Sequence, residues 1–587
     1  MATKVVDLET DGLEYTKIHV MVGRDPDTDH VDILTTYEEM RNYATTHPEI
    51  VGHNILGFDW WAIRDCLGIT PPVNSWVDTL CMSRIDHSNR DGGHSLGAWG
   101  ERLGITKPEH EDWSVLSDAM INRCVEDTKI NAKLYRLLKN SIREKEIPWT
   151  EVELECFVHW KMEEVRRNGF YFDIEQCQIL RAELNDKRTS CELQLAGLLP
   201  PLAEAKKVKG EYVTTMPIRK GDGGLNRRNL RDCPESWFFD GAPFVWVDWP
   251  DASFSRDEFV RRHLILAGWK PKVFTPTGLP KLDDELLDDI IHQVGEKYRP
   301  YQEWRILNTR ITKQIDKWLE FYNEHTHRQH GKIISIGTRT HRMAHRDPPV
   351  TQVPSSDAAY GHECRELWGV PEGKHLLGCD ASGIQLRVLA HYLDSPEWTD
   401  ELINGDVHQR NADILGCDRP KAKTFIYSFL LGAGIPKLAT QINKPVDETG
   451  RLYKRFIRET PGLESFMKKQ KSQAKKGHIY SGISGRWMPC ASDWHGDWLA
   501  SLLQEGEATI MKRALKIWCG QAEKKGVQYS ISTQNHDEWQ TEVNSEADAH
   551  TLGRLQVLSL EQAGRYYNCK CPITGEYKVG KTWKETH

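Results

Sequence analysis

Two neighbouring carboxylates, Asp537 and Glu538, stand in the stretch "STQNHDEWQTEV" (532–543), where Trp539 and Val543 suggest a partly buried pair of strands. Taking a carboxylate out of water costs several kcal/mol unless a cation or hydrogen bonds compensate. The pair therefore indicates either a solvated hairpin tip or a place where something cationic binds.

A further carboxylate has the same character. In "LLGCDASGIQLRVLAHY", Asp380 ends an apolar run that is typical of a strand, and Gln385 follows five residues later. Asp380 and Asp537 on adjacent strands would chelate two Mg²⁺ ions, which would explain acids in an apolar sheet. Two such ions would lower the pKa of an attacking hydroxyl and stabilise the charge on a transferring phosphoryl group.

A cationic helix face is predicted between these two segments. In "DRPKAKTFIYSFLLGAG", Arg419, Lys423 and Tyr427 recur at intervals of four and so share one face of a helix, and His408 lies just upstream. The basic groups would hold a triphosphate, and the Tyr427 ring would lie beside its base. Taken singly, Arg and Lys at this spacing usually form a solvated stripe, and a Tyr usually packs in a core.

The N-terminal region carries a second set of acids. Asp7 and Glu9 lie two apart on an expected strand, so both point to the same face. Asp59 follows "NILGF", and Asp127 lies on an expected helix. Together these four carboxylates could hold two divalent cations and activate a water for phosphodiester hydrolysis, although a solvated strand end would also explain the first pair.

Several domains must position these groups, because single cores stop growing at roughly 250–300 residues and the chain has 587. Residues 1–135 alternate short β-rich runs with helical stretches, which predicts an α/β domain. Residues 199–253 break the pattern with a basic series followed by an aromatic series, as an inserted subdomain would. Helical periodicity is predicted for 150–198, 256–267, 301–322, 419–431 and 498–519.

Composition narrows the class of protein. The formal net charge of −8 does not exclude a nucleic-acid partner, because contact with phosphate depends on local Lys and Arg clusters. The 14 scattered cysteines indicate reduced thiols in a cytosolic protein. Apolar runs are too short for a membrane span, and the N-terminus enters a strand at once, leaving no room for a signal peptide. We therefore expect no membrane partner and a location in the cytoplasm of a bacterial host.

The motifs carry two resemblances. The order and spacing of the N-terminal acids, with "GGHSLGAWGERLG" at 92–104, resemble the DEDD family of 3′–5′ exonucleases. The segments with Asp380, "AKTFIYSFLLGAG" and "HDEWQ" resemble motifs A, B and C of family A, the DNA polymerase I-like DNA polymerases. The strings "VDTLCMSRIDHS", "SRDEFVRRHLILAGW" and "GKTWKETH" are similar to the replicative polymerases of podovirus-type bacteriophages.

The resemblance implies an α/β multidomain fold, in which an N-terminal RNase H-like DEDD 3′–5′ exonuclease domain precedes a right-hand polymerase of thumb, palm and fingers. The expected boundaries are the exonuclease domain at 1–147, the thumb at 148–340 with its insert at about 199–253, the first part of the palm at 341–404, the fingers at 405–480 and the second part of the palm at 481–587.

The resemblance also implies roles for residues. Asp380, Asp537 and the carbonyl of Ala381 would ligate two Mg²⁺ ions, with Glu538 as an auxiliary carboxylate, and Asp7, Glu9, Asp59 and Asp127 would ligate two more. Lys423 would be catalytic, and Arg419, Lys423, Tyr427, His408 and Gln385 would bind the nucleotide. Primer–template DNA would be contacted by Arg342, Arg486, Gln504 and His536.

Four positions depart from the pattern, and a fifth refines it. Arg123 stands where proofreading exonucleases usually have a Tyr that positions the water. Gln385 replaces the usual Glu that screens the sugar 2′ position, Leu431 replaces a second Tyr of the fingers helix, and Ala500 replaces an expected Asn. Tyr427 is typical of enzymes that readily accept dideoxynucleotides.

The expected function is DNA-dependent DNA synthesis from dNTPs with 3′–5′ proofreading, in phage DNA replication. A thioredoxin-like processivity factor at 199–253 and a replicative helicase–primase are possible partners. One alternative is a DEDD-type 3′–5′ exonuclease whose C-terminal half only binds primer–template. A non-catalytic scaffold is a second, against which the intact acids argue, because a binding-only site has no use for uncompensated carboxylates facing phosphate.

Overall fold

The computed structural model describes residues 3–201, 251–490 and 495–587, with four short strands between them: β7 (Glu204–Ala205), β8 (Lys207–Val208), β9 (Glu211–Tyr212) and β10 (Val247–Asp248). The chain divides into two compact units. The first joins Met1–Ile174 to Trp318–His587, and the second is Glu175–Lys317. No described helix is long and apolar enough to cross a membrane.

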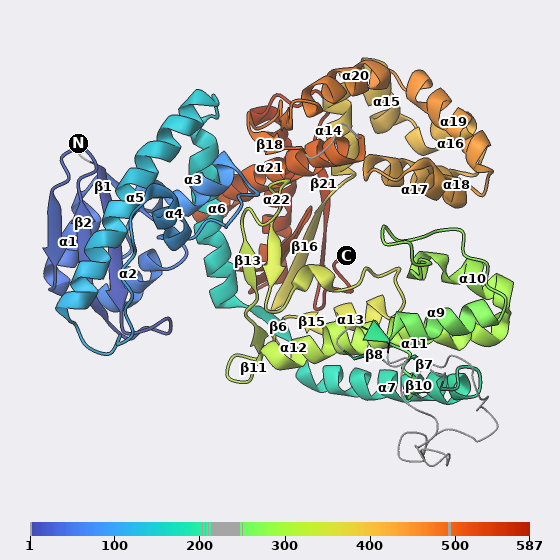
Figure 1. Ribbon diagram of the computed structural model, residues 1–587. Coiled ribbons are helices and arrows are strands. Elements are labelled where there is room, and N and C mark those ends of the chain that lie inside the picture. Colours follow the sequence, from blue (N-terminus) through green and yellow to red (C-terminus); the bar gives the residue numbers. More distant parts are fainter. Residues whose placement is uncertain are drawn as a thin grey trace, which may run out of the picture. The chain divides into compact units, whose positions relative to one another are not determined.

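The N-terminal part of the first unit is a five-stranded sheet covered by helices (Figure 1). Its strand order is β3-β2-β1-β4-β5, with β1 antiparallel to β2 and parallel to β4. Every residue of β2 is buried, and α5 packs on both β1 and β2. The strands are β1 (Thr3–Thr10), β2 (Ile18–Arg24), β3 (Val31–Leu34), β4 (Glu49–Gly52) and β5 (Trp76–Asp78), and the helices are α1 (Tyr37–Thr46), α2 (Asp59–Leu67), α3 (Thr79–Asp86), α4 (Leu96–Leu103) and α5 (Asp118–Glu144).

A second sheet has the order β19-β20-β16-β21, and all its pairings are antiparallel. It is formed by β16 (His375–Ala381), β19 (Tyr529–Asn535), β20 (Glu538–Val543) and β21 (Gly575–Gly580). Helix α22 (Glu546–Tyr566) packs across β16 and β21, and α21 (His495–Lys524) packs along α22. All six residues of β20 are buried, so the sequence "EWQTEV" is a central strand and not a solvated hairpin tip.

In sequence, the segment between β16 and β19 is mostly helical. The predicted helix at 419–431 is α17 (Arg419–Leu430), and the predicted helix at 498–519 lies within α21. The other elements of this region are α13 (Gly361–Glu366), α14 (Ile384–Leu393), α15 (Pro396–Asn404), α16 (Val407–Leu415), α18 (Ile435–Ile442), α19 (Val446–Glu459), α20 (Leu463–Ala474), β17 (His478–Tyr480) and β18 (Trp487–Pro489).

Helix α6 (Trp149–Asn168) belongs to the first unit, where it packs on α3, α21, β13 (Lys332–Ile334) and β19. Ten of its residues are buried, Glu151 and Glu155 among them. A helix that is buried on several sides belongs with the elements that cover it, and the division between the two units falls after residue 174. The expected thumb at 148–340 stays a prediction, because the two units do not by themselves delimit a thumb.

Smaller sheets also belong to the first unit. One has the order β11-β12-β6-β15, and two-stranded sheets pair β13 with β14 and β17 with β18. Their bounds are β6 (Phe170–Phe172), β11 (Tyr322–Asn323), β12 (Arg328–Gln329), β14 (Ala344–Arg346) and β15 (Trp368–Gly369).

The second unit is helical, as the periodicity at 256–267 and 301–322 predicts. The Trp304 indole donates to Glu192 at 2.8 Å and so ties α11 to α7. The expected insert at 199–253 falls mostly outside the described residues. The helices are α7 (Ile174–Ala196), α9 (Asp257–Leu266), α10 (Leu287–Val294), α11 (Arg299–Thr309), a π-helical turn (Arg310–Ile315) and α12 (Asp316–Phe321).

Candidate active sites

The two expected catalytic aspartates meet at one end of the second sheet. Asp380 is paired in register with Glu538, and the Ala381 amide donates to the Asp537 carbonyl at 2.9 Å. His536 and Asp537 form the two-residue connection between β19 and β20, and His536 has a φ of 56°. A positive φ is the conformation that such short hairpin turns demand. The turn therefore places Asp537 beside the end of β16.

Both aspartates hold their protons unusually strongly. Burial, then the neighbouring charge of Glu538, raises the pKa of Asp380 to about 6. Burial, then the charges of Glu507 and Asp380, raises the pKa of Asp537 to about 8. Desolvated carboxylates that repel one another favour a bound cation, because its charge removes both causes of the shift.

Glu538 has different surroundings from Asp537. Its carboxylate accepts from the Trp583 indole at 2.6 Å and from the Gln540 amide at 2.5 Å, and it lies 3.2 Å from His587 Nδ1. Two buried hydrogen bonds and the His587 ring therefore satisfy most of this carboxylate. The quoted segment "GKTWKETH" contains Trp583 and His587, but nothing in their spacing to Glu538 predicted this contact.

The cationic face of α17 lies near these acids. The rings of His408 and Tyr427 are 6.1 Å apart between centroids, and Arg419 pairs with Asp406 at 2.7 Å. Burial, then the charges of Arg419 and Lys423, lowers the pKa of His408. Burial, then the charge of Asp537, raises the pKa of Tyr427. Tyr427 on this helix face therefore lies within electrostatic reach of Asp537.

Three of the residues expected to contact DNA, Arg342, Gln504 and His536, are placed by their own contacts. Gln504 accepts from the Thr340 hydroxyl at 3.1 Å, and burial and Arg342 lower the pKa of His536 to about 4. Arg342 itself pairs with Glu507 at 2.5 Å. Sequence reasoning missed Glu507; the signal that could have found it is an acid on the apolar face of a strongly predicted helix.

Arg486 corrects a prediction. We expected it to contact DNA, but its side chain is 0% exposed and donates to Glu155 at 2.7 Å and to Glu151 at 2.9 Å. Lys512 and Arg513 pair with the same two acids. Two carboxylates hold the two terminal nitrogens of this guanidinium inside the protein, and the contacts join α6 to the β17–β18 hairpin.

The four N-terminal acids also converge. Burial, then the charges of Asp127, Asp59 and Glu9, raises the pKa of Asp7 well above its ordinary value, and burial raises the pKa of Glu9 to about 7. Burial raises the pKa of Asp59 and Asp127 as well. Ligand atoms of Asp7, Glu9 and Cys124 lie within 4.8 Å of one another. Strand β1 and helices α2 and α5 therefore form one acidic cluster.

Two cations border this cluster. Lys107 pairs with one oxygen of Asp127 at 2.5 Å, and the other oxygen is buried and accepts no hydrogen bond from a described residue. Arg123 lies 3.5 Å from Glu9, donates to the Pro108 carbonyl at 2.6 Å and covers the Trp113 ring at 5.1 Å. These contacts hold the Arg123 side chain against Glu9.

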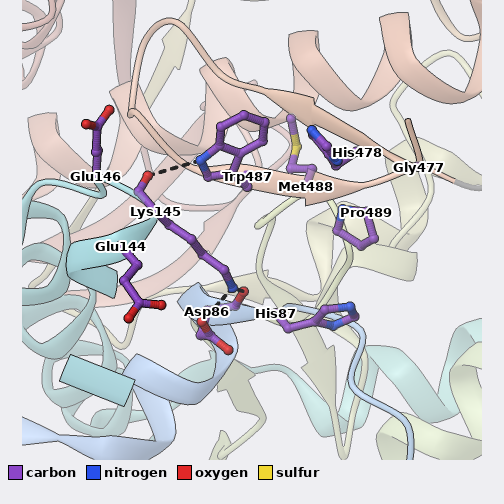
Figure 2. Close-up of a pocket in the computed structure, with 10 residues that line it drawn as sticks. All are labelled: Asp86, His87, Glu144, Lys145, Glu146, Gly477, His478, Trp487, Met488 and Pro489. Atoms are coloured by element: carbon purple, nitrogen blue, oxygen red, sulfur yellow. Dashed lines mark hydrogen bonds and ion pairs between the residues drawn. The ribbon is translucent and has the colours of Figure 1, made fainter. Parts of the chain in front are cut away.

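A cavity of about 520 Å³ lies apart from both clusters, between the region of α3 and α5 and the β17–β18 hairpin (Figure 2). Trp487 donates to the Lys145 carbonyl at 3.1 Å, and the Lys145 ammonium pairs with Asp86 at 2.6 Å. Three acids line the cavity, Asp86, Glu144 and Glu146. Because its one lysine is already paired, the cavity offers little to a phosphate chain.

Comparisons with known proteins find similarity to DNA polymerases. A sequence profile described as "DNA polymerase family A" matches residues 262–585. The "DNA-directed DNA polymerase" of Enterobacteria phage T3 is 27% identical over 631 residues, and that of Escherichia phage T7 is 26% identical over 630; each alignment covers 88% of both chains.

A solved structure shares the fold. It is the "POL domain of Pol1 from M. smegmatis complex with DNA primer-template and dNTP", with a TM-score of 0.77, 16% identity and coverage of 99% of this chain and 96% of that one. The profile matches more than half of the sequence. The chain therefore belongs to DNA polymerase family A and is similar to the polymerases of T7-like phages.

Proposed function

We propose that this protein is a DNA-directed DNA polymerase that adds deoxynucleotides to a primer on a DNA template. One observation carries the proposal: Asp380 and Asp537, both desolvated, lie together at a sheet edge within electrostatic reach of Tyr427 on a cationic helix face. Phosphoryl transfer needs this combination, with a charged clamp for the phosphates on one side and acids for cations on the other.

The donor set fits hard divalent cations such as Mg²⁺. Asp380, Asp537 and the Ala381 carbonyl offer oxygen ligands, and the raised pKa values of the two aspartates mark an unmet need for positive charge. When bound, two such ions would supply Lewis-acid activation of the primer hydroxyl and stabilise charge on the phosphates.

The remaining roles fall to the protein. Arg419, Lys423 and His408 bind the triphosphate, and Tyr427 packs against the base. Arg342, Gln504 and His536 contact the minor groove of the primer–template, where an acceptor is present on every base pair and pairing geometry can be tested without reading sequence. Lys423 is exposed on α17, in position to reach a ligand.

A 3′–5′ exonuclease is a second proposed activity. The converging acids of β1, α2 and α5 and the unpartnered oxygen of Asp127 support it, since a two-cation site would satisfy both. Arg123 occupies the place of the usual Tyr, and its ion pair with Glu9 keeps a cation where that Tyr would position water. We expect slower hydrolysis with the metal ligands retained.

The biological setting follows from the relatives. A polymerase of this kind would replicate phage DNA in the cytoplasm of a bacterial host, with primer–template DNA and dNTPs as ligands. A helicase–primase and a thioredoxin-like processivity factor are further proposed partners, the latter at 199–253. Deleting 203–250 is expected to shorten product runs while single-nucleotide addition persists, and unchanged run lengths would remove this partner from the proposal.

A primer-extension gel tests both activities. A 5′-labelled primer on a longer template is incubated with Mg²⁺, with and without dNTPs. We expect extension that Asp537→Ala abolishes and, without dNTPs, shortening that Asp7→Ala abolishes. Shortening in both lanes without any extension would instead support the DEDD-type exonuclease whose C-terminal half only binds primer–template.

A further inference from the structure

Glu507 is a buried carboxylate in the middle of α21, with its side chain 1% exposed. Its Oε2 accepts a hydrogen bond from Gln385 Nε2 at 2.9 Å and pairs with Arg342 Nη2 at 2.5 Å. Its Oε1 is buried and accepts no hydrogen bond from any described residue. The carboxylate thus links Gln385 and Arg342, two residues of the proposed active site.

The contact fixes which way the Gln385 amide faces. A carboxylate can only accept hydrogen bonds, so the amide must turn its NH₂ group toward Glu507 and keep its carbonyl oxygen away from it. The Gln385 side chain is thereby anchored at its far end. Without Glu507 the amide would be free to flip or to change rotamer.

Glu507 also lies close to the reacting groups. Burial is the main cause of the raised pKa values of Asp537 and Asp380, and the charge of Glu507 raises both further. Burial, then the Arg342 guanidinium that Glu507 holds, lowers the pKa of His536. Burying a further acid beside two others is unfavourable, and among the described residues Arg342 is the ion-pair partner that offsets it. An acid at position 507 therefore lowers stability, and packing alone does not explain why it is there.

We propose that Glu507 is a positioning residue for nucleotide selection: by holding the Gln385 amide in one orientation, it keeps the Gln385 side chain against the 2′ position of the incoming sugar and so sets discrimination between deoxyribose and ribose. This inference rests on the proposed polymerase function. A side chain held in one orientation excludes a 2′-hydroxyl by its bulk, whereas a mobile one can move aside and admit it, so loss of the anchor lowers the preference for dNTPs.

The test measures kcat/KM for one dNTP and its ribonucleotide in single-nucleotide addition. Glu507→Met keeps the side-chain length but removes both hydrogen bonds, and we expect the dNTP preference to fall by roughly tenfold. Glu507→Gln retains an oxygen that can accept both bonds, so it should keep most of the preference. Glu523→Met makes the same replacement at an exposed position of α21 and should change nothing.

The Gln385→Met variant separates a role in selection from a role in stability. If Glu507 acts through Gln385, this variant loses the preference to the same extent, and the double variant loses no more than either single one. Unchanged preference in Gln385→Met would overturn the inference, whether or not Glu507→Met folds. Unchanged preference in a folded Glu507→Met would do the same. A wild-type protein that adds no nucleotide would instead overturn the proposed function itself.

Discussion

Arg486→Met is the sharpest test of where the structure departs from the sequence-based expectation. Arg486 is fully enclosed, with its two guanidinium ends bound to Glu155 at 2.7 Å and Glu151 at 2.9 Å. Methionine keeps the length of the side chain but offers neither charge nor donor. The substitution therefore leaves two buried carboxylates with one partner fewer each.

The magnitude follows from what remains. Breaking a buried ion pair by removing one partner costs about 3–5 kcal/mol. Here Glu155 keeps Lys512 at 2.8 Å and Glu151 keeps Arg513 at 2.9 Å, so the lower end of that range applies. A loss of about 3 kcal/mol reduces the equilibrium constant for folding roughly a hundredfold, because about 1.4 kcal/mol corresponds to a factor of ten.

Urea unfolding followed by tryptophan fluorescence measures this loss, and fluorescence anisotropy with a labelled primer–template measures affinity for DNA. Arg458→Met is the matched control, because Arg458 is 71% exposed on α19. We expect a lower midpoint only for Arg486→Met and equal DNA affinity of the folded proteins. An unchanged midpoint with weakened DNA binding would refute the reasoning and restore Arg486 as a DNA contact.

Three further predictions concern buried acids. Because the pKa values of Asp537 and Asp380 are raised to about 8 and about 6, the folded state binds more protons than the unfolded state from about pH 4 to 8, and without metal these groups lower stability as pH rises. Thermal unfolding should therefore show more stabilisation by Mg²⁺ at pH 8 than at pH 6. Equal stabilisation at the two pH values would contradict the assignment of these acids as metal ligands. Trp583→Phe removes the indole donor to Glu538 and should reduce the free energy of unfolding in urea by about 2 kcal/mol, whereas no change would mean that the hydrogen bond contributes nothing. Burial alone would raise the pKa of Glu505, but hydrogen bonds and nearby cationic charge lower it to about 2. The contribution of Glu505 to the free energy of unfolding, about 3 kcal/mol, is therefore present above pH 4.5 and lost as pH falls toward 2. Acid unfolding of Glu505→Gln should show a weaker pH dependence over that range.

The local pattern predicted elements well where one helix or strand carried its own signal. Spacing of four put Arg419, Lys423 and Tyr427 on one face, and α17 begins at Arg419. The spacing of Asp7 and Glu9 likewise identified a strand whose two carboxylates join one cluster. Such signals are readable because backbone geometry alone sets the periods of 3.6 and 2.

Contacts between distant segments could not be read in this way. The partners of Arg486 lie more than three hundred positions earlier in the chain, on α6, which the family resemblance placed in the expected thumb. Nothing in the local sequence distinguishes a buried guanidinium from one that faces DNA, because both occur in polar, turn-rich segments.

By itself, the sequence identified the candidate residues for chemistry: the acids at 380, 537, 7, 9, 59 and 127 and the basic helix face that lies in sequence between residues 380 and 537. Only the tertiary structure decided how each acid is satisfied. Asp537 is left desolvated beside Glu507, while its neighbour Glu538 is held by Trp583 and Gln540. Residue type sets what a side chain can bind, but burial and long-range packing set what surrounds it, and that environment decides which of two adjacent carboxylates still requires a cation.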